Sequence, residues 1–220
     1  MYMIIVGAGS IGTSLIDISV GEKNNVVVID ANGDRAREIS TKYDITVLSG
    51  DATSADTLRE AGSERADAVI VTTSDDAVNL MVVSIAADLG IPSIVSVVND
   101  AEHADFFRTL GAHVMENPED VVAHHLYNAV RRPHVQDFAM LTHGAQIFRL
   151  HISESSPLID RSVEEAIERD ILPECVRVVA IDREGTPTTA IDDLTILADD
   201  VLTLFALERV SDELIEKISG

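Results

Sequence analysis

The chain has 220 residues and a formal net charge of −22, because 38 acidic side chains outnumber 16 lysines and arginines. This charge argues against nucleic-acid binding, which requires a cationic surface, and it argues against direct binding to anionic lipid headgroups. The single cysteine, Cys175, excludes an internal disulfide framework, and no apolar run approaches the roughly 18 residues that would cross a bilayer. Composition therefore predicts a soluble, cytoplasmic protein.

Residues 1–133 alternate short apolar runs with amphipathic ones. Strands are expected at 1–6, 26–30, 45–48, 68–72, 93–98 and 113–115. Helices are expected at 11–20, 33–42, 54–61, 75–89, 101–110 and 118–131. Apolar strands that alternate with helices predict an α/β fold, in which a doubly wound parallel sheet of the Rossmann type carries helices on both faces.

Polar, proline and glycine residues mark the ends of these helices. Thr53 with Asp56 resembles a capping box before the third helix. Pro118 stands at a first helical position, where its missing N–H is not needed. Gly90 and Gly111 fall where helices are expected to stop.

A glycine-rich turn with the spacing G-x-G-x-x-G follows the first strand, in the sequence Gly7-Ala8-Gly9-Ser10-Ile11-Gly12. Gly7 permits the tight turn, Gly9 lets the backbone approach a diphosphate, and Gly12 lets the helix pack closely on the strand. Asp30 ends the second strand, where its carboxylate can accept hydrogen bonds from both ribose hydroxyls and disfavours a 2′-phosphate. These features predict an adenine-nucleotide site that prefers NAD(H) over NADP(H).

The pattern changes after residue 133. Residues 134–145 are expected to be a linker, and residues 146–220 a small α+β domain. Its expected strands are 146–152, 176–182, 188–191 and 201–207, and its expected helices are 162–169 and 211–219. Ser162 and Glu165 are expected to cap the first of these helices.

Several motifs follow one another along the first domain. They are Ser49–Thr53 after the third strand, Thr72–Asp76 with Asn79 after the fourth, Phe106–Ala112, and Asn117–Glu119. In this order they resemble the RCK (KTN) regulatory domain of potassium channels and transporters, and most closely the TrkA family.

The second domain extends the resemblance, because four segments look like the C-terminal domain of that family: 156–159, 178–183, 192–195 and 198–202. The resemblance implies a non-catalytic, cytosolic, nucleotide-sensing regulatory subunit of a Trk/Ktr-type potassium uptake system. Such proteins form homodimers and higher rings at the inner face of the membrane, beneath a membrane potassium transporter subunit. The resemblance implies that the nucleotide gates this partner by changing the shape of the ring.

The resemblance also implies which residues bind the nucleotide. The glycine turn would hold the diphosphate, and Asp30 would hold the adenosine ribose. Asp51 and Ala52 would border the adenine, and Thr73 and Ser74 would close the pocket. Glu119 would lie near terminal phosphates or a bound cation. In that order the implied cofactor-binding residues are Gly7, Ala8, Gly9, Ser10, Ile11, Gly12, Asp30, Asp51, Ala52, Thr73, Ser74 and Glu119. NAD(H) is the expected ligand, with AMP, ADP or ATP as alternatives.

Two positions depart from the family pattern. Many relatives place a basic residue where Ser10 stands, and most have an arginine for the phosphates where this chain has Val97. Because a hydrogen bond to a charged group is typically worth about 1.5–3 kcal/mol, the loss of two cations favours a dinucleotide, AMP or ADP over ATP. The same departures leave open a site that binds weakly or has changed its ligand.

An NAD(H)-dependent oxidoreductase is the alternative function, because the same fold carries many hydride-transfer enzymes. Such an enzyme needs a proton donor and substrate anchors beside the nicotinamide, whereas the second domain offers one histidine in its body, His151, and no basic cluster. The histidines lack paired metal-ligand spacing, and the aspartate pairs 75–76, 192–193 and 199–200 are interpreted as helix caps and turns. No catalytic residue and no metal site are therefore expected.

Overall fold

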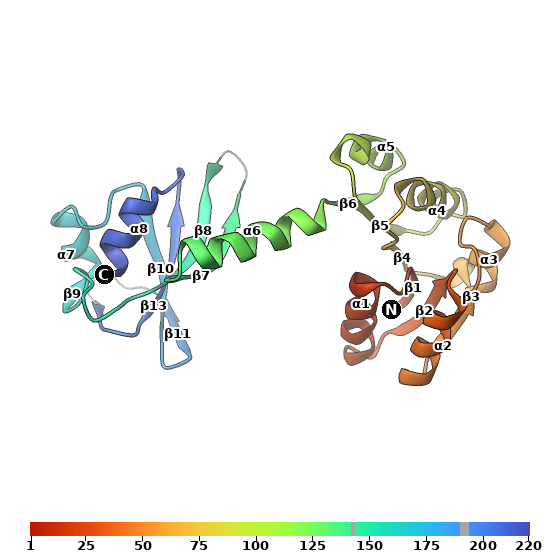
Figure 1. The fold of residues 1–220 in the computed structure, drawn as a ribbon, viewed down its shortest axis with the longest axis horizontal. Helices are drawn as coiled ribbons and strands as arrows, with labels where there is room; N and C mark the ends of the chain where they lie inside the picture. Colours follow the sequence, from red (N-terminus) through yellow and green to blue (C-terminus); the bar gives the residue numbers. More distant parts are fainter. Residues whose placement is uncertain (142–143, 190–193) are drawn as a thin grey trace. The chain divides into compact units, whose positions relative to one another are not determined.

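The computed structural model describes residues 1–141, 144–189 and 194–220, and Figure 1 shows its helices and strands. It comprises two compact units, Met1–Asp120 and Val121–Gly220. Helix α6, Pro118–Arg131, begins at the proline that the sequence places at a first helical position. None of the described helices combines the length and the apolar character needed to cross a membrane.

The first unit is built on a six-stranded parallel sheet with the strand order β3-β2-β1-β4-β5-β6. Its strands are β1 Tyr2–Val6, β2 Asn25–Asp30, β3 Thr46–Ser49, β4 Ala68–Val71, β5 Ser93–Val98 and β6 His113–Glu116. The strand order reverses between β1 and β4, and ligands of such sheets bind at the carboxyl ends of the strands beside this reversal. The predicted doubly wound parallel sheet is confirmed.

Helices cover both faces of this sheet. One face carries α1 Ser10–Gly21 and α2 Gly33–Lys42, and the other carries α3 Ala55–Glu60, α4 Asp76–Asp88 and α5 Ala104–Thr109. Successive strand residues point to opposite faces, so Ile5 packs with α1 and α2 while Ile4 packs with the other three helices. Because both faces are buried, the strands are nearly continuous apolar runs.

One predicted helix cap is wrong. The N-cap residue of α3 is Ser54, whose side chain makes no capping hydrogen bond, and Thr53 does not form a capping box with Asp56. Instead, the Asp51 carboxylate accepts hydrogen bonds from the N–H and the hydroxyl of Thr53, at 2.9 and 2.7 Å. The hydroxyl that would have capped the helix is therefore used in the preceding turn.

The second unit is a small α+β module, as predicted. Its main sheet is antiparallel, in the order β11-β10-β13-β8-β7, and a separate two-stranded sheet pairs β12 with β9. Its strands are β7 Val135–Met140, β8 Gln146–His151, β9 Arg161–Ser162, β10 Val176–Arg183, β11 Thr186–Thr189, β12 Thr195–Ile196 and β13 Val201–Ala206. Its helices beyond α6 are α7 Val163–Glu168, which has the predicted Ser162/Glu165 capping box, and α8 Asp212–Ser219. The end of the strand expected at 188–191 and the pair 192–193 lie outside the described residues.

Strand β7 lies in the segment 134–145 that the sequence indicates as a linker. It pairs with β8 at one edge of the antiparallel sheet. The pairing is irregular between Val135 and Phe138, and these two residues carry its contacts with the core of the unit. This irregularity breaks the two-residue apolar period by which a strand is found in a sequence. Where one functional domain ends and the next begins stays a prediction.

Candidate nucleotide-binding site

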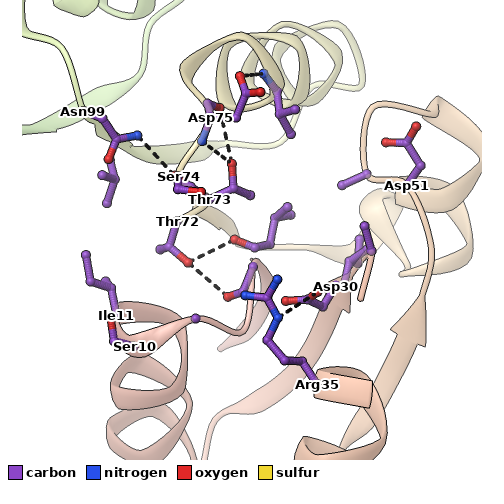
Figure 2. A pocket seen from close by; sticks show the side chains of 18 of the residues that line it. Ser10, Ile11, Asp30, Arg35, Asp51, Thr72, Thr73, Ser74, Asp75 and Asn99 are labelled. Carbon is purple, nitrogen blue, oxygen red and sulfur yellow. Dashed lines mark hydrogen bonds and ion pairs between the residues drawn. The ribbon is translucent and has the colours of Figure 1, made fainter. Parts of the chain in front are cut away.

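A cavity of about 350 Å³ lies at the carboxyl ends of β1, β2, β4 and β5 in the first unit (Figure 2). Its walls come from the loops after these strands, from the loop after β3, and from the starts of α1, α2, α4 and α6. Parallel strands place all their carboxyl ends at one edge, so residues far apart in the sequence meet there. Ten of the twelve residues that the sequence predicts for nucleotide binding line this cavity: Gly7, Gly9, Ser10, Ile11, Asp30, Asp51, Ala52, Thr73, Ser74 and Glu119.

Gly7 and Gly12 are required by the fold itself. Gly7 has a φ of +93°, in the region that favours glycine, and lies against Thr72. The Thr72 hydroxyl lies 3.1 and 3.0 Å from the carbonyl oxygens of Val6 and Gly7. A Cβ atom on Gly12 would lie 1.9 Å from the Gly7 carbonyl oxygen, well inside contact distance. Gly12 does not line the cavity. Its missing side chain lets α1 pack against the turn.

Gly9 differs from both, because nothing in the fold requires a glycine there. Its φ of −71° and ψ of −164° suit any residue, and a Cβ atom would meet only the Arg35 Nη1 atom, at 3.9 Å. Gly9 is also the N-cap of α1, whose first turn carries no acidic residue. The N–H groups of a first helical turn have no partner within the helix. The missing side chain thus leaves room beside the positive end of a helix.

Asp30 is held rigidly at the end of β2. It is 5% exposed, and its two carboxylate oxygens accept hydrogen bonds from the N–H groups of Ala8 and Asn32, each at 2.7 Å. Ala8 itself does not line the cavity, but its N–H group orients the Asp30 carboxylate, which does. Each carboxylate oxygen keeps a further lone pair, so Asp30 can still accept hydrogen bonds from a diol.

Asp51 and Ala52 form the wall after β3. The hydrogen bonds from the Thr53 hydroxyl and N–H lower the pKa of Asp51, which keeps this carboxylate ionised. Ala52 is buried and adds a small apolar surface beside it. A carboxylate next to an apolar wall can accept a hydrogen bond from the amino group of a base whose ring contacts the wall.

Thr73 and Ser74 continue the wall after β4, and a buried amide holds this loop in place. Asn79, on α4, donates hydrogen bonds to the carbonyl oxygens of Thr73 and Val97, at 3.0 and 3.2 Å. The Thr73 hydroxyl donates in return to the Asn79 amide oxygen, at 2.6 Å. Asn79 is fully buried, so one side chain ties the end of β5 to the loop after β4.

Asp76 fixes the loop that follows β5. Its carboxylate accepts hydrogen bonds from the N–H groups of Asn99 and Asp100, at 2.8 and 2.9 Å, and lies 2.9 Å from the His103 Nδ1 atom. Burial raises the pKa of Asp76, but these hydrogen bonds outweigh it and the pKa is lowered. The hydrogen bond to Asp76 in turn raises the pKa of His103. Because Asn99 lines the cavity and is held by Asp76, the Asp76–His103 pair supports the cavity wall at Asn99.

Arg35 lines the cavity as well, and the sequence analysis missed it. Its side chain reaches from the first turn of α2 toward Asp30, with Nε 3.7 Å from Oδ1 (Figure 2). The sequence contained a signal for Arg35, because the helix that follows Asp30 starts at the carboxyl end of β2, and a residue in its first turn lies near Asp30. The other charged side chains in the described lining are the carboxylates of Asp30, Asp51, Asp75 and Glu119. Across the described ranges, no group of three or more His, Cys, Asp or Glu side chains is arranged to hold a metal ion.

The chain is similar to known proteins along most of its length. The model of the TrkA-N domain family matches residues 3–118. The Trk system potassium uptake protein TrkA homolog of Methanothermobacter thermautotrophicus is 28% identical over 171 residues, which are 77% of this chain and 79% of that protein. The Trk system potassium uptake protein TrkA of Vibrio alginolyticus is 30% identical over 210 residues, which are 91% of this chain. This chain spans 45% of the length of the Vibrio protein.

Solved structures share the fold. The GsuK channel bound to NAD matches 100% of this chain with a TM-score of 0.67 at 20% identity, and the match covers 39% of that chain. GsuK bound to ADP matches 60% of this chain with a TM-score of 0.53 at 23% identity, over 35% of that chain. At these identities the likeness establishes architecture and leaves the ligand of this chain to be tested.

Proposed function

This chain belongs to the TrkA-N domain family, and we propose that it is a nucleotide-sensing regulatory subunit of a potassium uptake system. In this proposal the cavity of the first unit binds an adenine nucleotide, with NAD(H) preferred and AMP, ADP or ATP as alternatives. A homodimer or higher ring of such chains passes the signal to a Trk/Ktr-type membrane potassium transporter. The names of the relatives, and the NAD and ADP bound to GsuK, support this reading.

The bare backbone at Gly9 is the observation that carries the proposal. Packing accounts for Gly7 and Gly12, but it does not account for Gly9. A diphosphate would occupy the space that a side chain would fill, and it would accept hydrogen bonds from the first N–H groups of α1. Asp30 would accept the ribose hydroxyls, and its charge would repel a 2′-phosphate, which favours NAD(H) over NADP(H).

The cavity lining favours binding over catalysis. Hydride transfer to a carbonyl substrate needs a proton donor, and the described lining residues include no histidine, lysine, cysteine or tyrosine. The two curated relatives are named as uptake proteins. We therefore propose no catalytic residue, and an NAD(H)-dependent oxidoreductase is the alternative that a turnover assay tests.

Exposed apolar side chains on α6 support assembly with further copies of the chain. Five of them are between 54% and 85% exposed: Val121, Val122, Leu126, Tyr127 and Val130. Exposed apolar clusters commonly mark surfaces that contact another protein. Within an assembly, a nucleotide would act by binding one arrangement of the subunits more tightly than another.

Calorimetric titration with NADH, NAD⁺, AMP, ADP and ATP tests the nucleotide site, with two glycine variants as probes. Gly9→Ala places a Cβ atom in the open space, so we expect normal folding and affinity lowered by roughly tenfold or more, about 1.4 kcal/mol per tenfold. Gly21→Ala is the matched control, because nothing lies within 4 Å of its Cβ position at the far end of α1. We expect it to bind like the wild-type protein.

Four outcomes would contradict parts of the proposal. Unchanged affinity in Gly9→Ala would refute the placement of the diphosphate. Failure of the wild-type protein to bind any of the five nucleotides would refute nucleotide sensing. Consumption of NADH with an added carbonyl substrate would favour the oxidoreductase. A monomer in sedimentation velocity, with and without nucleotide, would refute signalling through a ring.

A further inference from the structure

Arg35 is placed where a phosphate group would lie. Its backbone is held in the first turn of α2, because the Asn32 side chain accepts hydrogen bonds from the N–H groups of Asp34 and Arg35, at 3.0 and 3.1 Å. The guanidinium lies between Asp30, with Nε 3.7 Å from Oδ1, and the open space at Gly9, with Nη1 3.9 Å from the Cβ position. Figure 2 shows it directed into the cavity.

The donors of Arg35 are largely unused within the chain. A separation of 3.7 Å from Asp30 is too long for a hydrogen bond, and the guanidinium donates no hydrogen bond to any other residue of the described ranges. Its side chain is 52% exposed. A guanidinium carries five N–H donors in a planar fork that matches a phosphate. These donors are therefore available beside the space that Gly9 leaves open.

The charges around the cavity give this arginine a particular role for an anionic ligand. Among the described residues of the lining, Arg35 is the only cation and four others are carboxylates. A phosphate that enters is repelled by those carboxylates and attracted beside Gly9, where Arg35 and the first N–H groups of α1 face the same open space. Because Asp30 and Gly9 lie on either side of that position, the phosphate there would be the one attached to a ribose held by Asp30.

We propose that Arg35 is the phosphate-contacting residue of this cavity and that it sets the class of ligand. The class is a nucleotide with one or two phosphates next to the ribose, as in AMP, ADP or a dinucleotide, rather than a triphosphate. A third phosphate finds no second cation in the described lining and adds charge near carboxylates. This inference rests on the nucleotide-binding function proposed above for the same cavity.

Two matched variants of α2 test the inference. Arg35→Gln and Arg37→Gln each remove one positive charge from the helix, but the Arg37 side chain is 79% exposed, pairs with Asp34 and does not line the cavity. Calorimetry without divalent cations gives the affinities for adenosine, AMP, ADP, NADH and ATP, and thermal unfolding checks that each variant is folded. We expect Arg35→Gln to weaken ADP and NADH by roughly five- to twentyfold. Both variants should bind adenosine with the affinity of the wild-type protein. The wild-type protein itself should bind ATP no more tightly than ADP.

The contrary outcomes separate this inference from the proposed function. Equal ADP affinities in the two variants would overturn the role of Arg35 while the nucleotide site stands. An equal loss of adenosine affinity in Arg35→Gln would show that Arg35 acts through Asp30, and would overturn the phosphate contact. Wild-type binding of ATP roughly tenfold more tightly than ADP would overturn the ligand class. Failure of the wild-type protein to bind any nucleotide would overturn the proposed function, and this inference with it.

Discussion

Two arginine–aspartate pairs, one in each unit, show how the same residue types serve different purposes. In the second unit, Arg183 donates hydrogen bonds to both carboxylate oxygens of Asp200, each at 2.8 Å, and Asp200 is 1% exposed. In the first unit, Arg35 lies 3.7 Å from Asp30, whose oxygens are already bound by backbone N–H groups. The first pair stabilises the chain, whereas the second leaves donors for a molecule that enters the cavity.

The two kinds of sheet account for this difference. A parallel sheet collects its carboxyl strand ends at one edge, so polar groups gather around an open space. The antiparallel sheet of the second unit has no such edge, and several charged side chains of this unit pair with one another. Arg149 lies 3.0 Å from Asp182, and the buried Arg132 donates to Asp212 at 2.6 Å. Charges that are paired in this way indicate structural roles.

Gly12→Ala should have the largest effect on stability. It sharpens the comparison because Gly12 and Gly9 share one turn, but only Gly12 is required by packing. The new Cβ atom would lie 1.9 Å from the Gly7 carbonyl oxygen, so α1 must move away from the turn. We expect the first unit to lose about 4 kcal/mol or more of its free energy of unfolding, while the second unit unfolds as before. Hydrogen exchange, read separately in each unit, measures both. Stability equal to that of Gly9→Ala would show that the packing role of Gly12 is wrong.

Asp200→Asn tests the paired arginine of the second unit. The amide keeps the size of the side chain but removes the charge that holds Arg183 and the N–H of Leu197, the latter at 2.8 Å. We expect the second unit to lose about 2–3 kcal/mol, less than for a fully buried pair because Arg183 is 42% exposed. Nucleotide affinity should not change.

The control for this variant is Asp56→Asn, which removes an exposed ion pair with Arg59 in the first unit. Its stability should change by less than about 0.5 kcal/mol. Urea denaturation measures both variants. If Asp200→Asn lowered ADP affinity as much as Arg35→Gln, the division between a ligand-facing and a structural arginine would fail.

The smallest expected effect is a pH dependence at the edge of the cavity. The hydrogen bond to Asp76 raises the pKa of His103, and the charges of Asp100 and Glu102 act in the same direction. A raised folded pKa means that the stabilisation is complete below the unfolded value of about 6.5 and is lost as the pH rises through the folded value. The melting temperature of the first unit should therefore fall as the pH rises above about 6.5.

Substitution of the histidine checks the source of this dependence. His103→Gln should reduce the slope of melting temperature against pH, whereas substitution of the exposed His113 by Gln should leave it unchanged. Equal slopes in wild-type protein and His103→Gln would show that the pair with Asp76 does not contribute. In that case the wall around Asn99 would be held by the Asp76 carboxylate alone.

Local sequence patterns predict most of the fold. The period of apolar residues predicts β1 to β6 and the helices between them, because each strand is buried on two faces and each helix on one. The same patterns miss β7, where pairing is irregular between Val135 and Phe138. They also misplace the cap before α3, because Asp51 competes for the Thr53 hydroxyl. A pattern fails where two groups compete for one partner or where the spacing is interrupted.

The sequence by itself determined the fold class, the glycine turn and the acidic end of β2, since these depend on neighbouring or regularly spaced residues. Only the tertiary structure separated Gly9, which the fold does not need, from Gly12, which it does. It also brought Arg35 beside Asp30 and made one cavity from segments that follow different strands of the parallel sheet. The physical reason is that strand register and helix packing join segments far apart in the chain, and no local spacing encodes those contacts.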